Sequence, residues 1–346
     1  MVRSPESLAL LRDGYRRYDE YVDVVSCFEW LFDETQDLPE TVKHFERFPK
    51  CLVPGKGRGK SARTVTPDFL VVFEDDSVLV GEIASIARHE NSVDKLCSQL
   101  LAYEAIAEVS VGDGTKISPS RIDVMWLVSV ELSNDACTRV LDDRFHNADH
   151  EFKPQKAPCI VQYARLADKY TFARIPRPDN GVFLSGLPST NIGGYLDKNL
   201  NIRPERFVHI KTAKGFMNDP AEPLYLATYL YVRVWPLMFG RGTAEERITS
   251  QAVSAELQRT YSYGRHKEVV AALELLADAG LAAKQSNGTW TVKRKVLGSK
   301  GDREVHTKIL ELVEITQQRP APSRRATRNL MHAQLSLFDD IDSSPS

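Results

Sequence analysis

The sequence predicts an α/β fold, in which a mixed sheet flanked by helices is followed by a smaller domain and a flexible tail. Two observations indicate this arrangement. Segments with helical periodicity alternate with short apolar strands through residues 1–150, and helices followed by a hairpin occupy residues 223–300. The chain has 346 residues, 42% of them hydrophobic, which is enough for two or three domains with stable cores.

The first domain, residues 1–150, is expected to begin with helix. Leu, Tyr, Phe and Val recur at helical spacing over residues 7–48 and predict one or two helices, interrupted near Leu38 and Pro39. Two apolar strands then enclose a polar turn at 74–77, which predicts a β-hairpin. Its strands are expected at 66–73 and 78–84, and a helix, a buried strand and a second helix at 91–109, 121–130 and 134–145.

The remainder of the chain divides by composition. Residues 151–222 form a connecting region of undefined fold, apart from a hairpin across Asp168 and Lys169. Domain 223–300 ends in a hairpin closed by Asn287 and Gly288, a strong turn signal. Its helices are expected at 224–239, 250–260 and 264–279. A further helix at 301–318 precedes the tail, 319–346, which is rich in Pro, Ser and Arg.

Charge and cysteine content narrow the class of protein. The formal net charge of −2 gives no global attraction to nucleic acid, so DNA contact needs local basic patches. Five scattered cysteines without a C-x-x-C pair indicate neither a disulfide framework nor a zinc site. No signal-like N-terminus occurs, and no apolar run reaches the roughly 18 residues that span a bilayer. We therefore expect a cytoplasmic protein with no membrane partner.

The tail carries a short motif at 334–338, which reads Gln334, Leu335, Ser336, Leu337 and Phe338. QLSLF resembles the pentapeptide by which bacterial replication and repair proteins bind the DNA polymerase sliding clamp. Apolar anchors that enter a pocket, with one amide fixing the direction, suit such a peptide. The resemblance implies the sliding clamp as a partner. The alternative is a terminal strand or helix end that packs on the body of the protein.

Two carboxylates lie on the strands of the predicted hairpin. Asp68 follows Pro67 at the start of the first strand, and Glu82 lies in the second, so the turn brings them side by side. This pattern, in the order helix, hairpin, helix, strand and helix, resembles the PD-(D/E)xK nuclease superfamily over roughly residues 20–150. The resemblance implies a restriction-endonuclease-like mixed sheet and a Mg²⁺ or Mn²⁺ cofactor held by Asp68 and Glu82 for phosphodiester hydrolysis.

The third position of that motif is Ala84, where members of the superfamily carry lysine. A nearby helix supplies the cation in some members, and here Lys95, Gln99 and Tyr103 share one helix face. The spacing from Gln99 to Tyr103 resembles the Q-L-x-x-Y motif of RecB-like nucleases, which implies that both residues lie near the metal and the DNA. Lys95 is the candidate catalytic cation, or else an ordinary exposed lysine.

The sequence does not decide which residues complete the site. Arg88 and His89, just after the second strand, are weaker substitutes for the missing lysine. A further acid from the N-terminal helical region is common in the superfamily. The candidates are Glu29, Glu34 and Glu46.

The loop before Asp68 is basic and rich in glycine. It is not a P-loop, because Pro54 stands where the first glycine is required and a strand, not a helix, follows Ser61. Its basic residues are expected to contact DNA phosphates beside the cleavage site, unless the loop is simply solvated. They are Lys56, Arg58, Lys60 and Arg63.

Residues 223–300 resemble a winged helix, since three helices precede a hairpin with a basic second strand. In DNA-binding members the third helix enters the major groove by its first residues, while the wing contacts the backbone. The resemblance implies DNA contacts from Arg265, His266, Lys267, Lys293 and Arg294. The alternative is a spacer or a protein-binding module.

Together these patterns predict a metal-dependent DNA nuclease, associated with the nucleoid and recruited through the sliding clamp during repair or defence against phage and plasmids. The rival interpretation is a catalytically inactive, nuclease-fold protein that binds DNA or recruits other factors, with Ala84 marking a decayed site. Cleavage mode, strand preference and oligomeric state are not defined by the sequence.

Overall fold

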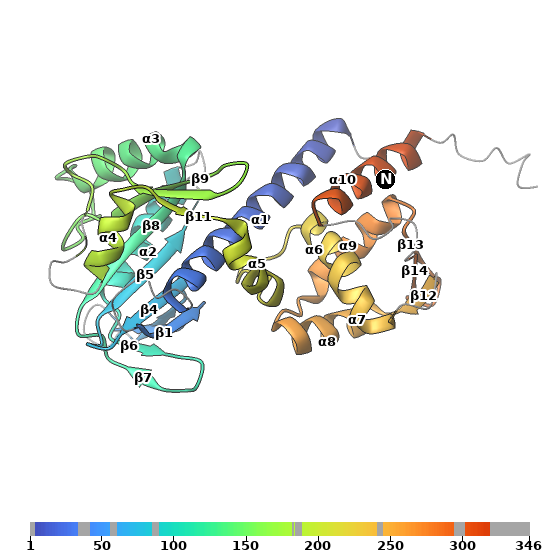
Figure 1. Cartoon of the computed structure of the whole chain (residues 1–346), viewed down its shortest axis with the longest axis horizontal. Helices are drawn as coiled ribbons and strands as arrows, with labels where there is room; N and C mark the ends of the chain where they lie inside the picture. The colour runs from blue at the N-terminus through green and yellow to red at the C-terminus, as the bar shows by residue number, and fades with distance from the viewer. Residues whose placement is uncertain are drawn as a thin grey trace, which may run out of the picture. The chain divides into compact units, whose positions relative to one another are not determined.

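The computed structural model describes residues 4–33, 42–55, 61–84, 90–181, 183, 189–240, 245–293 and 302–318 (Figure 1). The chain forms two compact units. The sheet unit comprises Asp19–Asp219, and the terminal unit comprises Met1–Tyr18 together with Pro220–Ser346. The long helix α1, Pro5–Asp33, contributes its first residues to the terminal unit and the rest to the sheet unit.

A seven-stranded mixed sheet forms the centre of the sheet unit, in the order β1-β4-β5-β8-β9-β10-β11. Strands β5, β8 and β9 run parallel, and the other neighbouring pairs are antiparallel. In sheet order the strands are Val42–Arg47, Phe69–Phe73, Val78–Ile83, Ile122–Ser129, Cys159–Arg165, Tyr170–Arg174 and Leu200–Ile202.

A second, four-stranded antiparallel sheet has the order β3-β2-β6-β7. Its strands are Arg63–Val65, Lys50–Val53, Glu108–Ser110 and Lys116–Ile117. The helices of this unit, besides the end of α1, are α2 at Glu90–Glu104, α3 at Ser133–Ala136 with a π-helical continuation at Cys137–Phe145, α4 at Ser189–Leu196 and α5 at Pro204–Ala213.

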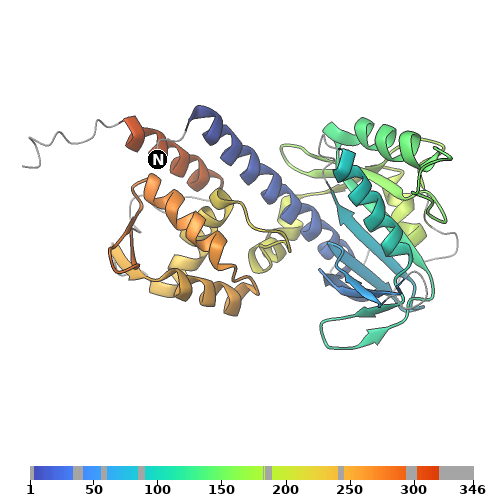
Figure 2. The same ribbon diagram turned by 180° about the vertical axis from the view of Figure 1, so that it is seen from behind.

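Helices cover both faces of the central sheet. Alternate residues of β4 point to opposite faces. Leu70 packs in a core that includes Leu100 of α2, whereas Phe69 stacks on Phe28 of α1 with ring centroids 5.2 Å apart. Figure 2 shows α2 on the face of the sheet turned away from the viewer in Figure 1. Full burial of such side chains contributes about 1.5–3 kcal/mol each. The prediction of a mixed α/β sheet flanked by helices is therefore confirmed.

Gly81 of β5 shows how closely these layers approach. The ring of Phe69 lies over Gly81, its partner in register, and a Cβ at this position would come within 2.0 Å of the ring. A larger residue would therefore displace Phe69 from its stack on Phe28. This glycine directly precedes Glu82, so the packing also fixes the backbone that carries the carboxylate.

Two parts of the sequence prediction are wrong, and one region that it left undefined gains a fold. Residues 42–47, expected to be helical, form the edge strand β1, because pairing with β4 and stacking of Phe45 on Phe69 outweigh the helical spacing. The helix expected up to Val109 ends at Glu104, and β6 follows at 108–110. Residues 151–219, most of the connecting region whose fold the sequence left undefined, belong to the sheet unit and supply three strands of the central sheet.

The terminal unit combines helices with a three-stranded antiparallel sheet, β12-β14-β13. The strands are Glu245–Ile248, Trp290–Lys293 and Ala282–Lys284. The helices are α6 at Pro223–Tyr229, continued by a π-helical turn at Leu230–Val234 and α7 at Trp235–Phe239, then α8 at Ser250–Tyr261, α9 at His266–Asp278 and α10 at Asp302–Gln318. The predicted closing hairpin is present, and β12 is a strand that the sequence did not predict.

Candidate active site

The two predicted carboxylates meet at one end of the central sheet. Phe69 pairs with Gly81, so Asp68, just before β4, lies opposite Glu82 near the end of β5. Asp68 Oδ2 accepts a hydrogen bond of 2.7 Å from the backbone N–H of Ile83. Asp68 is half-buried and Glu82 is buried. The hairpin therefore positions both side chains as the sequence predicts, and we call them the carboxylate pair.

Tyr103 of α2 contacts the carboxylate pair directly. Its hydroxyl donates a hydrogen bond of 2.7 Å to Glu82 Oε2, and its ring is buried in the core between α2 and the sheet. Burial raises the pKa of this phenol, and the negative charge of Glu82 raises it further. Tyr103 therefore stays protonated and acts as a fixed donor to Glu82.

The carboxylate pair carries charge that the described residues do not neutralise. Burial raises the pKa of Asp68 to about 7, against the lowering effect of the hydrogen bond from Ile83. Burial also raises the pKa of Glu82 well above its usual value, and the charge of Asp68 adds to this effect. Among the described groups, burial and neighbouring carboxylates have the largest effects that raise these pKa values, so the pair favours binding of a proton or a cation.

A third carboxylate, Asp219, acts on both members of the pair. Its negative charge raises the pKa of Asp68 and of Glu82, although Asp219 itself is exposed. It lies beyond α5, in a stretch without helical or strand periodicity, so no sequence pattern marked it. Within the described ranges, no group of three or more His, Cys, Asp or Glu side chains is arranged to hold a metal ion.

The structure places the motif helix residues at different distances from the pair. Gln99 is half-buried, one turn before Tyr103. Lys95 is exposed two turns before Tyr103, about 12 Å along the helix axis, and makes no hydrogen bond or ion pair with any residue that the structure describes. Ala84 is half-buried and donates a backbone hydrogen bond of 3.3 Å to Leu127 O. Neither Lys95 nor Ala84 thus supplies a cation in contact with the pair.

Glu29, one of the candidate additional acids, belongs to a separate set of contacts. Its carboxylate is buried and accepts from Arg47 Nε at 2.5 Å and from Lys214 Nζ. Arg47 also donates to Ser26 Oγ at 2.9 Å. Glu29 is therefore already neutralised by two cations.

Glu46 and the remaining candidates do not complete the pair either. Glu46 accepts a hydrogen bond of 3.0 Å from the backbone N–H of Gly112 in the loop between β6 and β7. Glu34, Arg88 and His89 lie outside the described residues.

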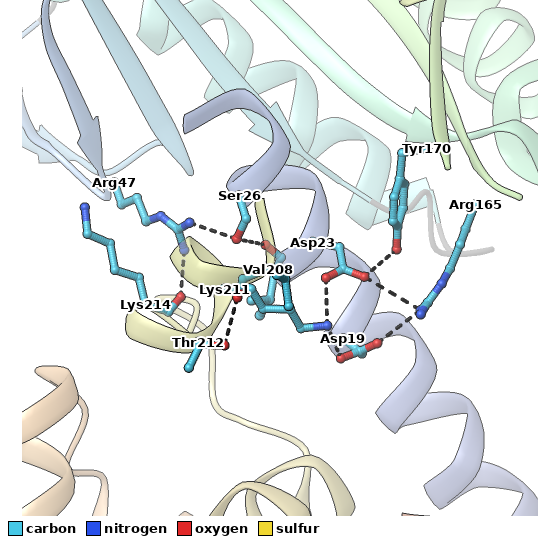
Figure 3. Close-up of polar contacts among 11 residues, drawn as sticks. Asp19, Asp23, Ser26, Arg47, Arg165, Tyr170, Val208, Lys211, Thr212 and Lys214 are labelled. Atoms are coloured by element: carbon cyan, nitrogen blue, oxygen red, sulfur yellow. Dashed lines mark hydrogen bonds and ion pairs between the residues drawn. The ribbon is translucent and has the colours of Figure 1, made fainter. Parts of the chain in front are cut away.

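A second group of charges joins α1 to α5 and to the β9–β10 hairpin (Figure 3). Lys211 of α5 contacts Asp19 at 2.5 Å and Asp23 at 2.7 Å, Arg165 contacts Asp19 at 3.0 Å, and the Tyr170 hydroxyl donates to Asp23 at 2.7 Å. We call these five residues the α1–α5 clasp. Burial opposes ionisation of Asp19, but Lys211 and Arg165 outweigh it and lower the pKa of that carboxyl. The clasp is saturated with internal partners and has a structural role.

The predicted DNA-binding residues are only partly described. Arg265, His266 and Lys267 are exposed at the start of α9, where His266 Nε2 lies 2.9 Å from Ser250 Oγ. Lys293 is exposed at the end of β14, directly opposite Glu245, which reduces the positive charge there. The predicted residues that lie outside the described part of the chain are Lys56, Arg58, Lys60, Arg294 and the tail motif 334–338.

Comparison of the chain with models of protein families, with curated proteins and with solved structures gives no match. In the part of the chain that the structure describes, no helix is both long enough and apolar enough to cross a membrane. The chemistry of the carboxylate pair and its surroundings is therefore the basis on which a function can be assigned.

Proposed function

We propose that the protein is a Mg²⁺-dependent deoxyribonuclease whose sheet unit belongs to the PD-(D/E)xK superfamily. The single observation that carries the proposal is the carboxylate pair. Two acids from adjacent strands lie side by side, at least half-buried, with no cation among the described groups that set their pKa values. Unpaired buried charge is costly unless a ligand compensates it.

The arrangement of the surrounding elements supports the same assignment. An antiparallel hairpin, β4 and β5, is followed by α2 and then by β8, which is parallel to β5. This is the order that the superfamily resemblance implies. The strands are buried along their whole length, so they hold Asp68 and Glu82 rigidly.

Oxygen donors of this kind fit Mg²⁺ or Mn²⁺, which bind carboxylates and retain several waters. Asp68 and Glu82 would hold the ion, and the charge of Asp219 would strengthen its attraction. A bound Mg²⁺ supplies the divalent charge that stabilises a phosphodiester under attack and lowers the pKa of water.

The chain's own residues then have distinct tasks. Tyr103 fixes the orientation of Glu82 through its hydrogen bond. Gln99, one turn before Tyr103 on α2, would contact the DNA strand beside it. Lys95 would serve as the catalytic cation only after its exposed side chain rearranges. A cation supplied by another part of the chain is therefore the better candidate.

The terminal unit supports a role on DNA. A strand, two helices and a hairpin follow α6 and α7, which is the order of a winged helix, with β12 as the first strand of its sheet. The exposed first turn of α9 carries Arg265, His266 and Lys267 for phosphate or groove contact. The tail motif would bind the sliding clamp and raise the local concentration of the nuclease on replicating or repairing DNA, in repair or in defence.

A cleavage assay tests the proposal. Purified full-length protein is incubated with single-stranded, double-stranded and branched DNA in Mg²⁺ or Mn²⁺. We expect cleavage by the wild type, a loss of at least about a hundredfold in Asp68→Asn, and no loss in the control Asp135→Asn, an exposed carboxylate on α3.

Absence of cleavage by the wild type in either metal on all of these substrates would overturn the proposal. That outcome would favour the rival function, a catalytically inactive DNA-binding or recruitment protein, for which Ala84 at the position of the motif lysine is the specific observation.

A further inference from the structure

A pocket of about 370 Å³ opens between α2 and the edge strand β3. One wall of the pocket is formed by the C-terminal half of α2 and the turn that follows it. Ser98, Leu101 and Ala102 follow the spacing i, i+3 and i+4, which places them on one side of the helix, and Ala105 follows directly after the end of α2. Sites for small organic ligands have volumes of about 300–1,000 Å³.

The opposite wall comes from β2 and β3. Val53 is buried and pairs in register with Arg63, so both side chains lie on the same face of that sheet, toward α2. Ser61 and Gly55 complete the rim. The pocket thus has an apolar floor, hydroxyl groups at its mouth and one guanidinium.

Arg63 is the chemical indicator of an anionic ligand. It is exposed, lines the pocket, and has no hydrogen-bond or ion-pair partner within the described ranges. A guanidinium at the mouth of an apolar pocket suits a phosphate attached to a flat, largely apolar group. A nucleotide combines these two features.

Helix α2 contributes both to the pocket and to the contacts of the carboxylate pair. Ala102, which lines the pocket, and Tyr103, which binds Glu82, are consecutive residues of α2 and lie on adjacent sides of one turn. On the other wall, Arg63 is five residues before Asp68. Both walls of the pocket are thus continuous in the chain with residues of the pair, through Ala102 and Tyr103 on one side and through Arg63 and Asp68 on the other.

We propose that this pocket holds one unstacked nucleotide of the DNA strand, with its base on Leu101, Ala102 and Ala105 and its phosphate at Arg63. The proposal rests on the proposed function, because the strand held for cleavage supplies the nucleotide. Enzymes that act on nucleic acid commonly place one displaced nucleotide in a fitted pocket.

Binding without metal tests this site separately from catalysis. The probes are thymidine tetranucleotide, thymidine monophosphate and thymidine, titrated into full-length protein in EDTA and followed by calorimetry. We expect the tetranucleotide to bind most tightly, the monophosphate more weakly and thymidine least. Ala105→Leu, which fills the pocket, and Arg63→Gln, which removes its charge, should each weaken tetranucleotide binding at least about tenfold.

Matched controls separate these effects from misfolding. Ala213→Leu at the end of α5 and Arg203→Gln before it are exposed positions in the same unit that do not line the pocket, and both should bind as the wild type does. Thermal unfolding of each variant checks its fold, and Arg63→Gln, at an exposed position, keeps the test valid if Ala105→Leu is unstable.

Three results would overturn the pocket assignment: no binding of any probe, equal binding by both pocket variants and the wild type, or tighter binding of the free monophosphate than of the tetranucleotide. The last would identify the ligand as a free nucleotide. If the protein never cleaves DNA but binds the tetranucleotide through Arg63 and Ala105, the nuclease proposal fails and the pocket assignment stands.

Discussion

At the scale of single residues, the carboxylate pair is defined by what surrounds it. The hairpin places Asp68 beside Glu82, Tyr103 orients Glu82, and Asp219 adds a third negative charge. Burial without a paired cation raises the pKa of both members of the pair. This makes the stability of the folded protein depend on pH and on divalent metal.

Substitution of Asp68 by Asn should remove part of that dependence. The folded-state pKa of about 7 lies above the usual value of 3.8, so the folded protein holds this proton more tightly than the unfolded chain does. The resulting stabilisation is complete below about pH 4 and is lost as the pH rises through 7. In metal-free buffer, the free energy of unfolding should therefore fall less steeply from pH 4 to 8 in Asp68→Asn than in the wild type.

Chemical denaturation at several pH values, with and without Mg²⁺, measures this effect. A ligand at a hundred times its Kd stabilises the folded state by about 2.7 kcal/mol, so Mg²⁺ at pH 8 should stabilise the wild type and the control Asp135→Asn but not Asp68→Asn. A wild-type pH slope, or a wild-type gain from Mg²⁺, in Asp68→Asn would contradict the assignment of this pair as a cation site.

At the scale of secondary-structure elements, the α1–α5 clasp holds the helices around the sheet (Figure 3). Lys211 lies between two buried acids, Asp19 and Asp23, and its side chain is 20% exposed. Lys214, one turn later on the chain, pairs with the buried Glu29 but is 57% exposed. The two lysines therefore form a natural comparison between a buried and an exposed ion pair.

Lys211→Ala should destabilise the protein by about 3–5 kcal/mol, because it leaves buried carboxylates without their main cation. Lys214→Ala should cost only about 0–1 kcal/mol, since its head group is largely in solvent and Glu29 keeps Arg47. Urea denaturation of the two variants measures both values. Similar losses in the two variants would show that the clasp does not act as a buried ion pair.

Some secondary-structure elements could be predicted from the sequence and others could not. The hairpin was predictable because apolar runs at 69–73 and 78–83 flank a polar turn, and both members of the carboxylate pair follow from it. Strand β1 was not, because Val42 and Phe45 are spaced as in a helix and only pairing with β4 decides their conformation. Local spacing reports periodicity, whereas an edge strand depends on a partner far along the chain.

Side-chain partners were the other part that the sequence could not provide. Glu29 looked like a candidate ligand because it is an acid on the N-terminal helix, yet Arg47 and Lys214 neutralise it. No sequence pattern marked Asp219 or the pocket at Ala105. A small residue such as Ala105 lines a pocket only once α2 and β3 are brought together in the fold. Tertiary contacts, not composition, decide which carboxylates remain able to bind a metal ion.

At the scale of the whole molecule, the tail motif is expected to supply the link to the replication machinery. Leu337→Ala combined with Phe338→Ala should weaken binding to a purified bacterial sliding clamp by at least about thirtyfold, because buried apolar anchors each contribute about 2 kcal/mol or more at such sites. Biolayer interferometry with immobilised clamp measures the change.

Ser343→Ala combined with Ser344→Ala is the matched control for the tail, since it makes the same number of alanine substitutions outside the motif. It should bind as the wild type does. Undiminished binding by the Leu337 and Phe338 variant would remove the sliding clamp as the partner of this segment.

Helix α1 determines how the chain can be divided. Tyr15 stacks on His306 at 4.1 Å and Tyr18 packs against Tyr225 at 4.6 Å, and Leu8 and Leu11 are buried beside them in sequence. A gene fragment that begins at Pro220 would thus express a polypeptide lacking one wall of its interior. Its recovery in folded form should require the first eighteen residues in trans, as in split-protein complementation.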